Sequence, residues 1–229
     1  MGRRQRLGRG VRYPAITDAL VIAAGYLLGS MPWGYWLPRL LRGIDIRTLG
    51  SGNPGATNVW RTLGFKFGIA VALLDIAKGS AAALLGLWLG GDLVGVLAGV
   101  AAMIGHWRPL FLGFARGGKM VATTGGVALA VAPLPALAAA GVWIVVFFAF
   151  RYASVASIVA AVSLPLWALL FGSSWPVIAF TSGAALAIVV LHRSNIRRLL
   201  AGEEHRIQLR RSRLDRASSK PTPPSPNRV

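Results

Sequence analysis

Seven apolar stretches dominate the chain, and each is long enough, or nearly so, to cross the hydrocarbon core of a membrane. They lie at residues 15–37, 67–89, 93–112, 121–132, 136–150, 155–171 and 176–191. A helix of about 20 apolar residues spans the roughly 30 Å of hydrocarbon in a bilayer. Hydrophobic residues fill 55% of the 229 positions and charged residues only 14%, which leaves too much apolar surface for a soluble domain. The sequence therefore predicts an all-α, polytopic integral membrane protein with seven transmembrane helices.

The boundary between the fourth and fifth stretches depends on two prolines. Residues 120–150 form one apolar run that would also suit a single tilted helix. Pro133 and Pro135 fall inside this run, and proline removes a helical hydrogen bond and clashes with the preceding turn. We therefore expect two helices here, which keeps the number of spans at seven.

Basic residues gather in the loops after the odd-numbered stretches and in the C-terminal tail, whereas the other loops carry almost no charge. By the positive-inside rule, the N-terminus lies outside and the C-terminus is cytoplasmic. Five arginines among the first twelve residues favour the opposite orientation, but the summed bias of the other loops outweighs them. We expect three parts: a basic N-terminal tail at 1–14, a membrane domain at 15–200, and a basic, Pro-rich, disordered cytoplasmic tail at 201–229.

A polar, glycine-rich loop interrupts this apolar chain. Residues 50–61 read Gly-Ser-Gly-Asn-Pro-Gly-Ala-Thr-Asn-Val-Trp-Arg. The three glycines permit positive φ angles and close backbone approach, and Pro54 rigidifies the turn. The short polar side chains and the guanidinium of Arg61 can donate hydrogen bonds to an anion. This pattern is typical of phosphate-binding loops, although ordinary turns use the same residue types.

Three further polar motifs fall at the same predicted membrane surface. They read Gly-His-Trp-Arg-Pro-Leu-Phe at 105–111 with Gly-Gly-Lys at 117–119, Arg-Tyr-Ala-Ser-Val-Ala-Ser at 151–157, and His-Arg-Ser-Asn-Ile at 192–196. Ionisable residues at membrane depth are costly, which favours a functional role for them. Structural roles remain open, because an interfacial histidine can be a simple hydrogen-bonding group. Ser154 and Ser157, three residues apart, can also serve to pack helices together.

In their residues and in their order along the chain, the four motifs resemble those of the PlsY family of bacterial acyl-phosphate:glycerol-3-phosphate acyltransferases. The resemblance extends over about residues 20–206. It implies a seven-helix protein of the bacterial inner membrane, with the N-terminus outside and the active site at the cytoplasmic face. It further implies transfer of a fatty acyl group from acyl phosphate to the 1-hydroxyl of glycerol 3-phosphate. The product would be lysophosphatidic acid, formed in an early step of phospholipid biosynthesis.

The resemblance also implies roles for individual residues. Ser51 and His106 are the candidate catalytic residues, with His106 orienting or deprotonating the attacking hydroxyl. Acyl phosphate is expected to bind at Ser51, Gly52, Asn53, Gly55, Thr57 and Asn58. Glycerol 3-phosphate is expected to bind at Arg61, Lys119, Ser154, His192 and Asn195. Because acyl phosphate is an activated mixed anhydride, the donor's own phosphate oxygens can accept the proton, and positioning then supplies most of the catalysis.

No cofactor and no metal are expected. The chain has no cysteine, and its clustered cytoplasmic carboxylates are limited to Glu203 and Glu204. No serine lies in a nucleophile-elbow sequence, so we expect direct transfer without an acyl-enzyme. The expected partners are the two substrates and membrane lipids. Topology and anionic headgroups account for the net charge of +18, and no nucleic acid partner is expected.

Other functions remain open on the sequence alone. A transporter for phosphate or an organophosphate would also use glycine-rich loops and arginines, although the chain shows no internal repeat. A noncatalytic scaffold would leave the four motifs unexplained. A thioester donor such as acyl-CoA is disfavoured, because no aspartate lies five residues after any of the three histidines.

Two further features bear on activity. The family pattern has glycine after Gly-Gly-Lys, whereas this chain has Met120, which would strain or crowd the acceptor site if a positive φ is needed there. On that argument Met120→Gly would raise activity, and an altered acceptor is the alternative. Asp75 and Lys78 lie three residues apart within one apolar stretch, and a buried ion pair that stabilises the bundle is favoured over a direct role in binding.

Overall fold

The computed structural model describes residues 15–207, and these form only helices and connecting loops. The all-α class is therefore confirmed. The expected tail at 1–14, and residues 208–229 of the other expected tail, lie outside the described residues. The elements are α1 (Ala15–Gly29), α2 (Trp33–Arg42), the 3-10 helix η1 (Ile46–Thr48), α3 (Ala56–Leu63), α4 (Phe65–Trp107), the 3-10 helix η2 (Leu110–Leu112), α5 (Val121–Val131), α6 (Pro133–Phe150), α7 (Ala153–Leu170), α8 (Trp175–Leu191) and α9 (Arg193–Leu200).

The long element α4 is a hairpin of two antiparallel helical arms. Its helical geometry breaks at Gly91, whose φ of 75° and ψ of −166° lie in a region that residues other than glycine rarely adopt. The arms touch beside this corner, since a Cβ on Gly86 would lie 2.6 Å from the carbonyl oxygen of Val94. At the far end, the carboxylate of Asp75 lies 3.5 Å from the imidazole of His106. The two arms correspond to the apolar stretches expected at 67–89 and 93–112.

The first apolar stretch, expected as one helix over residues 15–37, is broken. Helix α1 ends at Gly29, α2 begins at Trp33, and the two axes are bent by 41°. The break falls at Pro32, which has no backbone N–H and disfavours helical geometry at the residue before it. Helix α2 then extends beyond the expected stretch and ends in two basic residues, Arg39 and Arg42.

The expected break in the apolar run at 120–150 is confirmed. Helix α5 ends at Val131, and Ala132 leaves helical geometry with a φ of −153°. Helix α6 begins at Pro133, a position that suits proline because the first N–H of a helix has no intrahelical partner. The 11 residues of α5 are about 17 Å long, roughly half the hydrocarbon thickness of a bilayer.

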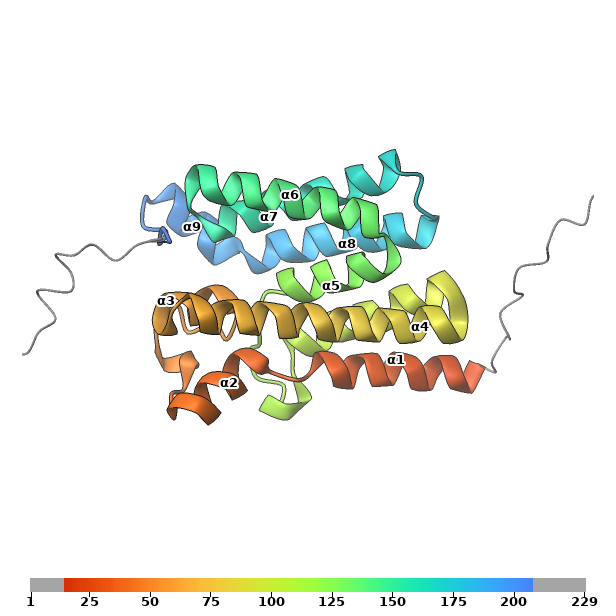
Figure 1. Ribbon diagram of the computed structural model, residues 1–229, viewed down its shortest axis with the longest axis horizontal. Coiled ribbons are helices and arrows are strands. Elements are labelled where there is room, and N and C mark those ends of the chain that lie inside the picture. Colours follow the sequence, from red (N-terminus) through yellow and green to blue (C-terminus); the bar gives the residue numbers. More distant parts are fainter. Residues whose placement is uncertain (1–14, 208–229) are drawn as a thin grey trace, which may run out of the picture.

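The helices pack as two groups with α5 between them (Figure 1). One group comprises α6, α7 and α8, and the other comprises α1 and the α4 hairpin. Small residues bring helices close together: Gly25 and Gly29 of α1 lie directly against the backbone of Ala98 and Ala102 in α4. By length and composition α4, α6 and α7 can cross a membrane, and the bent pairs α1–α2 and α8–α9 also qualify if each counts as one span.

The two ends of the bundle carry different connecting segments (Figure 1). Helices α3 and α9 lie at one end, and the Gly91 corner lies at the other. Residues 201–207 are assigned to the tail by the sequence, yet they pack against the helices. Ile207 is buried, and its backbone N–H donates to the carbonyl of Arg151 over 2.9 Å. The folded domain therefore extends to residue 207, because this short segment has backbone and apolar contacts of its own.

Candidate active site

The glycine-rich loop is shaped from inside by Asn58, in the first turn of α3. Its Oδ1 accepts a hydrogen bond from the backbone N–H of Ser51 over 2.9 Å, and its Nδ2 donates to the carbonyl of Leu49 over 3.0 Å. The side chain is buried. The side-chain amide of Asn58 is thus occupied in holding the loop. The backbone N–H groups of Ala56 and Thr57, the first two residues of α3, have no intrahelical acceptor and can donate to a ligand.

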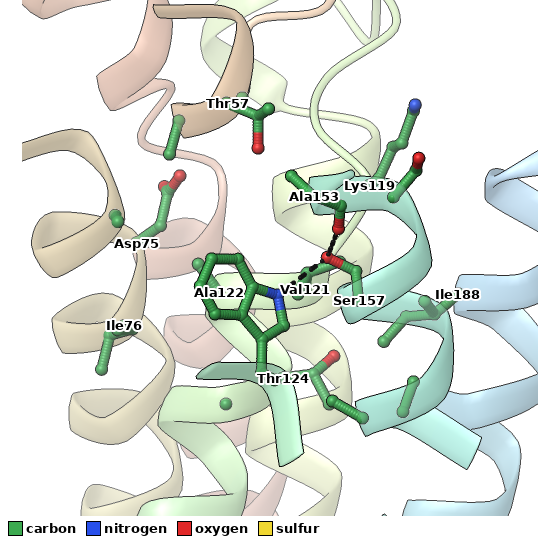
Figure 2. A pocket seen from close by; sticks show the side chains of 18 of the residues that line it. Thr57, Asp75, Ile76, Lys119, Val121, Ala122, Thr124, Ala153, Ser157 and Ile188 are labelled. Atoms are coloured by element: carbon green, nitrogen blue, oxygen red, sulfur yellow. Dashed lines mark hydrogen bonds between the residues drawn. The ribbon is translucent and has the colours of Figure 1, made fainter. Parts of the chain in front are cut away.

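The loop borders a cavity of about 400 Å³ within the bundle. Every site residue expected from the sequence except Gly52 lines this cavity, although these residues come from five separate parts of the chain. The polar side chains Thr57 and Lys119 lie at one end of the view in Figure 2, and the apolar Ile76 and Ala122 lie nearer the other. The fold therefore joins a polar chamber to an apolar one.

The apolar chamber runs between helices α4, α5, α6 and α7. Along α7 its lining extends from Ala153 to Leu164, a helical length of about 16 Å. Small residues leave the space open: the alanines at the wall are Ala72, Ala122, Ala128, Ala136, Ala139, Ala140, Ala160 and Ala161. The indole Nε1 of Trp143 donates to Ser157 Oγ over 3.1 Å, and this hydroxyl donates to the carbonyl of Ala153 over 2.7 Å (Figure 2). The shape and lining suit a hydrocarbon chain.

Glu204 organises the polar chamber from the segment after α9. Its Oε1 accepts hydrogen bonds from Ser154 Oγ over 2.9 Å and from Asn195 Nδ2 over 2.7 Å, and its Oε2 accepts from Arg198 Nε over 2.8 Å. Burial favours the neutral acid, but these three donors outweigh burial and lower the pKa of the carboxyl. Glu204 is therefore an ionised acceptor that fixes two of the expected acceptor-binding residues.

Two cations project into the chamber. Lys119 donates to Asn195 Oδ1, and burial, together with the nearby charge of Arg198, lowers the pKa of its ammonium to about 8. Arg61 donates from Nη2 to the carbonyl of His205 over 2.9 Å. Its Nε is buried and meets no hydrogen-bond acceptor among the residues that the structure describes. An unpaired buried donor is costly, so this atom favours an anionic ligand at the site.

His192 lies where α8 meets α9, with its Nδ1 2.8 Å from the carbonyl of Ile188. A carbonyl oxygen can only accept, so Nδ1 carries the proton and Nε2 remains an acceptor. Burial and the ammonium of Lys119 lower the pKa of this imidazole to about 4. His192 is therefore neutral near pH 7 and can accept a hydrogen bond from a ligand hydroxyl.

His106 is held by two charged residues of the other α4 arm. The Nζ atom of Lys78 lies 2.9 Å from His106 Nδ1 and 2.8 Å from Asp75 Oδ1, and all three side chains are buried. The sequence suggested the pair of Asp75 and Lys78 but not its contact with His106. That contact depends on the α4 hairpin, which brings residues 28 positions apart into hydrogen-bond distance.

Met120 adopts the left-handed geometry that its place in the motif suggested, with φ at 68° and ψ at −10°. Its side chain is buried in the apolar cluster around Met103 and Val127 and does not line the cavity. The expected strain is therefore present, but the side chain does not crowd the cavity.

These features describe an all-helical protein with apolar helices of membrane-spanning length and a cavity in which a polar chamber with two cations, Arg61 and Lys119, continues into an apolar chamber. The particular family follows from comparison. The chain belongs to the glycerol-3-phosphate acyltransferase family, because the model of that family matches residues 19–202.

Named relatives support this assignment. A glycerol-3-phosphate acyltransferase of Desulforudis audaxviator (strain MP104C) is 48% identical over 197 residues, which cover 86% of this chain and 99% of the relative. One from Synechococcus sp. (strain JA-3-3Ab) is also 48% identical, over 85% of this chain and 96% of the relative. The crystal structure of PlsY (YgiH), an integral membrane glycerol 3-phosphate acyltransferase, in its glycerol 3-phosphate form, matches with a TM-score of 0.80. It is 41% identical and covers 84% of this chain and 96% of that one.

Proposed function

We infer that this chain transfers a fatty acyl group to the 1-hydroxyl of glycerol 3-phosphate and so forms lysophosphatidic acid. The observation that carries this conclusion is the single cavity in which an anion-binding chamber meets a chamber sized for a hydrocarbon chain. Similar structures named as a glycerol 3-phosphate form and a lysophosphatidic acid form of PlsY, with TM-scores of 0.80 and 0.78, support the same acceptor and product. The protein is thus an acyltransferase of phospholipid biosynthesis.

We propose acyl phosphate as the donor. Its phosphate binds the backbone N–H groups at the start of α3 and the side chains of Ser51, Asn53 and Thr57, which line the cavity. The acyl chain then extends along the apolar wall of α7. Glycerol 3-phosphate binds on the other side of the polar chamber, with its phosphate on Arg61 and Lys119 and its hydroxyls near Ser154, His192 and Asn195.

In the reaction, the 1-hydroxyl oxygen of glycerol 3-phosphate attacks the acyl carbonyl carbon, and a carbon–oxygen ester bond forms. The bond between that carbon and the phosphate oxygen breaks, and inorganic phosphate leaves with the bonding electrons. The proton of the hydroxyl passes to the departing phosphate, so no net charge has to be stored on the protein. The residues supply positioning and neutralisation of the two phosphates.

The proposed topology places the polar chamber at the cytoplasmic face of a bacterial inner membrane. Seven crossings correspond to α1 with α2, the two arms of α4, α5, α6, α7 and α8. Helix α5 is too short to cross by itself, and the loop before it occupies the remaining depth beside the chamber. The N-terminus is then outside and the C-terminus inside, in agreement with the positive-inside rule.

The donor is tested with purified protein reconstituted in lipid vesicles. Lysophosphatidic acid is measured after addition of glycerol 3-phosphate together with either acyl phosphate or acyl-CoA. We expect product with acyl phosphate alone. Product with acyl-CoA alone would disprove the donor, whereas no product with either would disprove the acyltransferase function.

A further inference from the structure

Lys78 lies in the interior of the bundle, where it forms an ion pair with Asp75 and hydrogen-bond contacts with His106 and Met31. Its Nζ is 2.8 Å from Asp75 Oδ1, 2.9 Å from His106 Nδ1 and 2.8 Å from the carbonyl oxygen of Met31. An ammonium group has three N–H donors and no acceptor, so Nζ can only donate in its contact with His106. His106 Nδ1 must then be the accepting atom of this contact, and the hydrogen-bond pattern assigns the ring proton to Nε2.

The other side of the His106 ring supports the loop that carries Lys119. The Cα of Gly118 packs so closely on the imidazole that a Cβ there would collide with Nε2. The backbone N–H of Gly118 donates to the carbonyl of His106 over 3.1 Å. The ring is therefore a platform for the residue that immediately precedes Lys119.

The same contacts determine whether His106 can accept a proton from a substrate hydroxyl. The Nδ1 lone pair of His106 is directed at a cation, and Nε2 already carries a proton. Neither nitrogen can take a proton from a substrate hydroxyl in this arrangement. The geometry thus disfavours the role of general base that the sequence suggested for His106, and it favours a role in holding the loop.

We propose that Asp75 and Lys78 are positioning residues for the acyl transfer inferred above. They fix the orientation of His106 and, through it, the Gly117–Gly118 backbone that holds Lys119 over the phosphate of glycerol 3-phosphate. Lys78 also joins the two arms of α4 to the break between α1 and α2, through Met31. A well-packed apolar pair would stabilise a bundle as well as this buried ion pair does, so stability alone does not account for it.

The first test removes both charges together. A single Lys78→Met variant leaves the carboxylate of Asp75 buried without its partner and is expected to unfold. The double variant Asp75→Asn with Lys78→Met keeps the volume and leaves no unpaired charge. Folding is checked by size-exclusion chromatography and thermal unfolding, and KM is measured for each substrate. We expect a folded protein whose KM for glycerol 3-phosphate rises about tenfold, because Lys119 is displaced, with a change below about threefold for acyl phosphate.

Ser80→Ala is the matched control. Ser80 Oγ donates to the carbonyl of Gly126 over 2.8 Å and so links α4 to α5 without lining the cavity. Its loss should lower stability slightly and leave both KM values unchanged. A folded double variant with the KM of the unchanged protein for glycerol 3-phosphate would overturn the proposal, since the pair would then be structural only.

A second pair of variants decides the question even if the double variant does not fold. His106→Asn keeps an amide oxygen near the position of Nδ1, where it can accept from Lys78, and His106→Leu keeps no acceptor. We expect the KM for glycerol 3-phosphate to be about tenfold higher in the leucine variant than in the asparagine variant. Equal losses of kcat in both variants, at an unchanged KM, would instead identify His106 as a general base and refute the positioning role. These comparisons are made after the unchanged protein has been shown to form lysophosphatidic acid. If it forms none, the proposed function fails, and if it is active, the variants test the positioning role alone.

Discussion

Met120 is held in an unfavourable backbone geometry by the burial of its own side chain. A non-glycine residue in the left-handed region costs about 1–2 kcal/mol, and the φ of Met120 is 68°. Truncation of a buried methionine to alanine costs about 2–5 kcal/mol, and Met120 is only 6% exposed. Burial is therefore the larger effect, so Met120→Ala should lower the free energy of unfolding by about 2–5 kcal/mol.

Met120→Gly separates the two effects. Glycine relieves the strain but loses more conformational freedom on folding, by about 0.4–1 kcal/mol. The glycine variant should therefore be more stable than the alanine variant by about 0.5–1 kcal/mol and still less stable than the unchanged protein. The assay is thermal unfolding in detergent, with Met120→Leu as the control that keeps the apolar volume. Because the side chain does not line the cavity, turnover per folded molecule should not rise in Met120→Gly, contrary to the expectation from sequence. An alanine variant as stable as the glycine variant would show that the backbone at position 120 is not strained. A glycine variant more stable than the unchanged protein would show that burial of the Met120 side chain contributes less to stability than the strain costs.

Three other predictions concern the cavity. In the proposed site the ammonium form of Lys119 binds the phosphate of glycerol 3-phosphate, and the pKa of Lys119 is about 8. The KM for glycerol 3-phosphate should therefore rise above that pH, toward about tenfold per pH unit, and Lys119→Arg, which stays charged, should not show this rise. Glu204→Gln should lower the free energy of unfolding by about 1.5–3 kcal/mol, because an ionised acceptor of three hydrogen bonds is lost. In the unchanged protein the same stabilisation should be complete above the ordinary glutamate pKa and should disappear as pH falls through the lowered one, which a series of unfolding measurements at different pH values checks. Ala161→Leu should shift the preferred acyl chain toward shorter lengths in a competition assay, since it narrows the apolar chamber, and an unchanged preference would show that the chain lies elsewhere.

The sequence predicted the helical class and the apolar stretches because both depend on local composition. The break before α6 was also local, since Pro133 by itself ends one helix and begins the next. The break between α1 and α2 could have been read from Pro32, but the apolar run across it concealed the signal. Packing of residues 201–207 could not be predicted, because it depends on a surface that α6 and α7 form only after folding.

The candidate site was predictable as a set of motifs but not as a set of contacts. Glycines, serines and cations in four motifs pointed to phosphate, and these residues do meet in one cavity. The roles of Glu204 and Lys78 were not apparent. Each acts on side chains distant in the sequence: Glu204 lies 50 residues from Ser154, and Lys78 lies 28 residues from His106. The position of Lys78 inside an apolar stretch was the available signal for its network, whereas Glu204 lies after the last apolar stretch and gave no such signal.

The proposed function requires that one cavity holds two phosphates at separate positions, one for each substrate. The most direct measurement is the KM for both substrates in Lys119→Ala and in Thr57→Ala, with lysophosphatidic acid as the measured product. We expect opposite patterns: Lys119→Ala raises the KM for glycerol 3-phosphate, and Thr57→Ala raises the KM for acyl phosphate, each with a smaller effect on the other substrate. Equal effects of each variant on both substrates, or the reverse pattern, would show that the two phosphates do not occupy these separate positions.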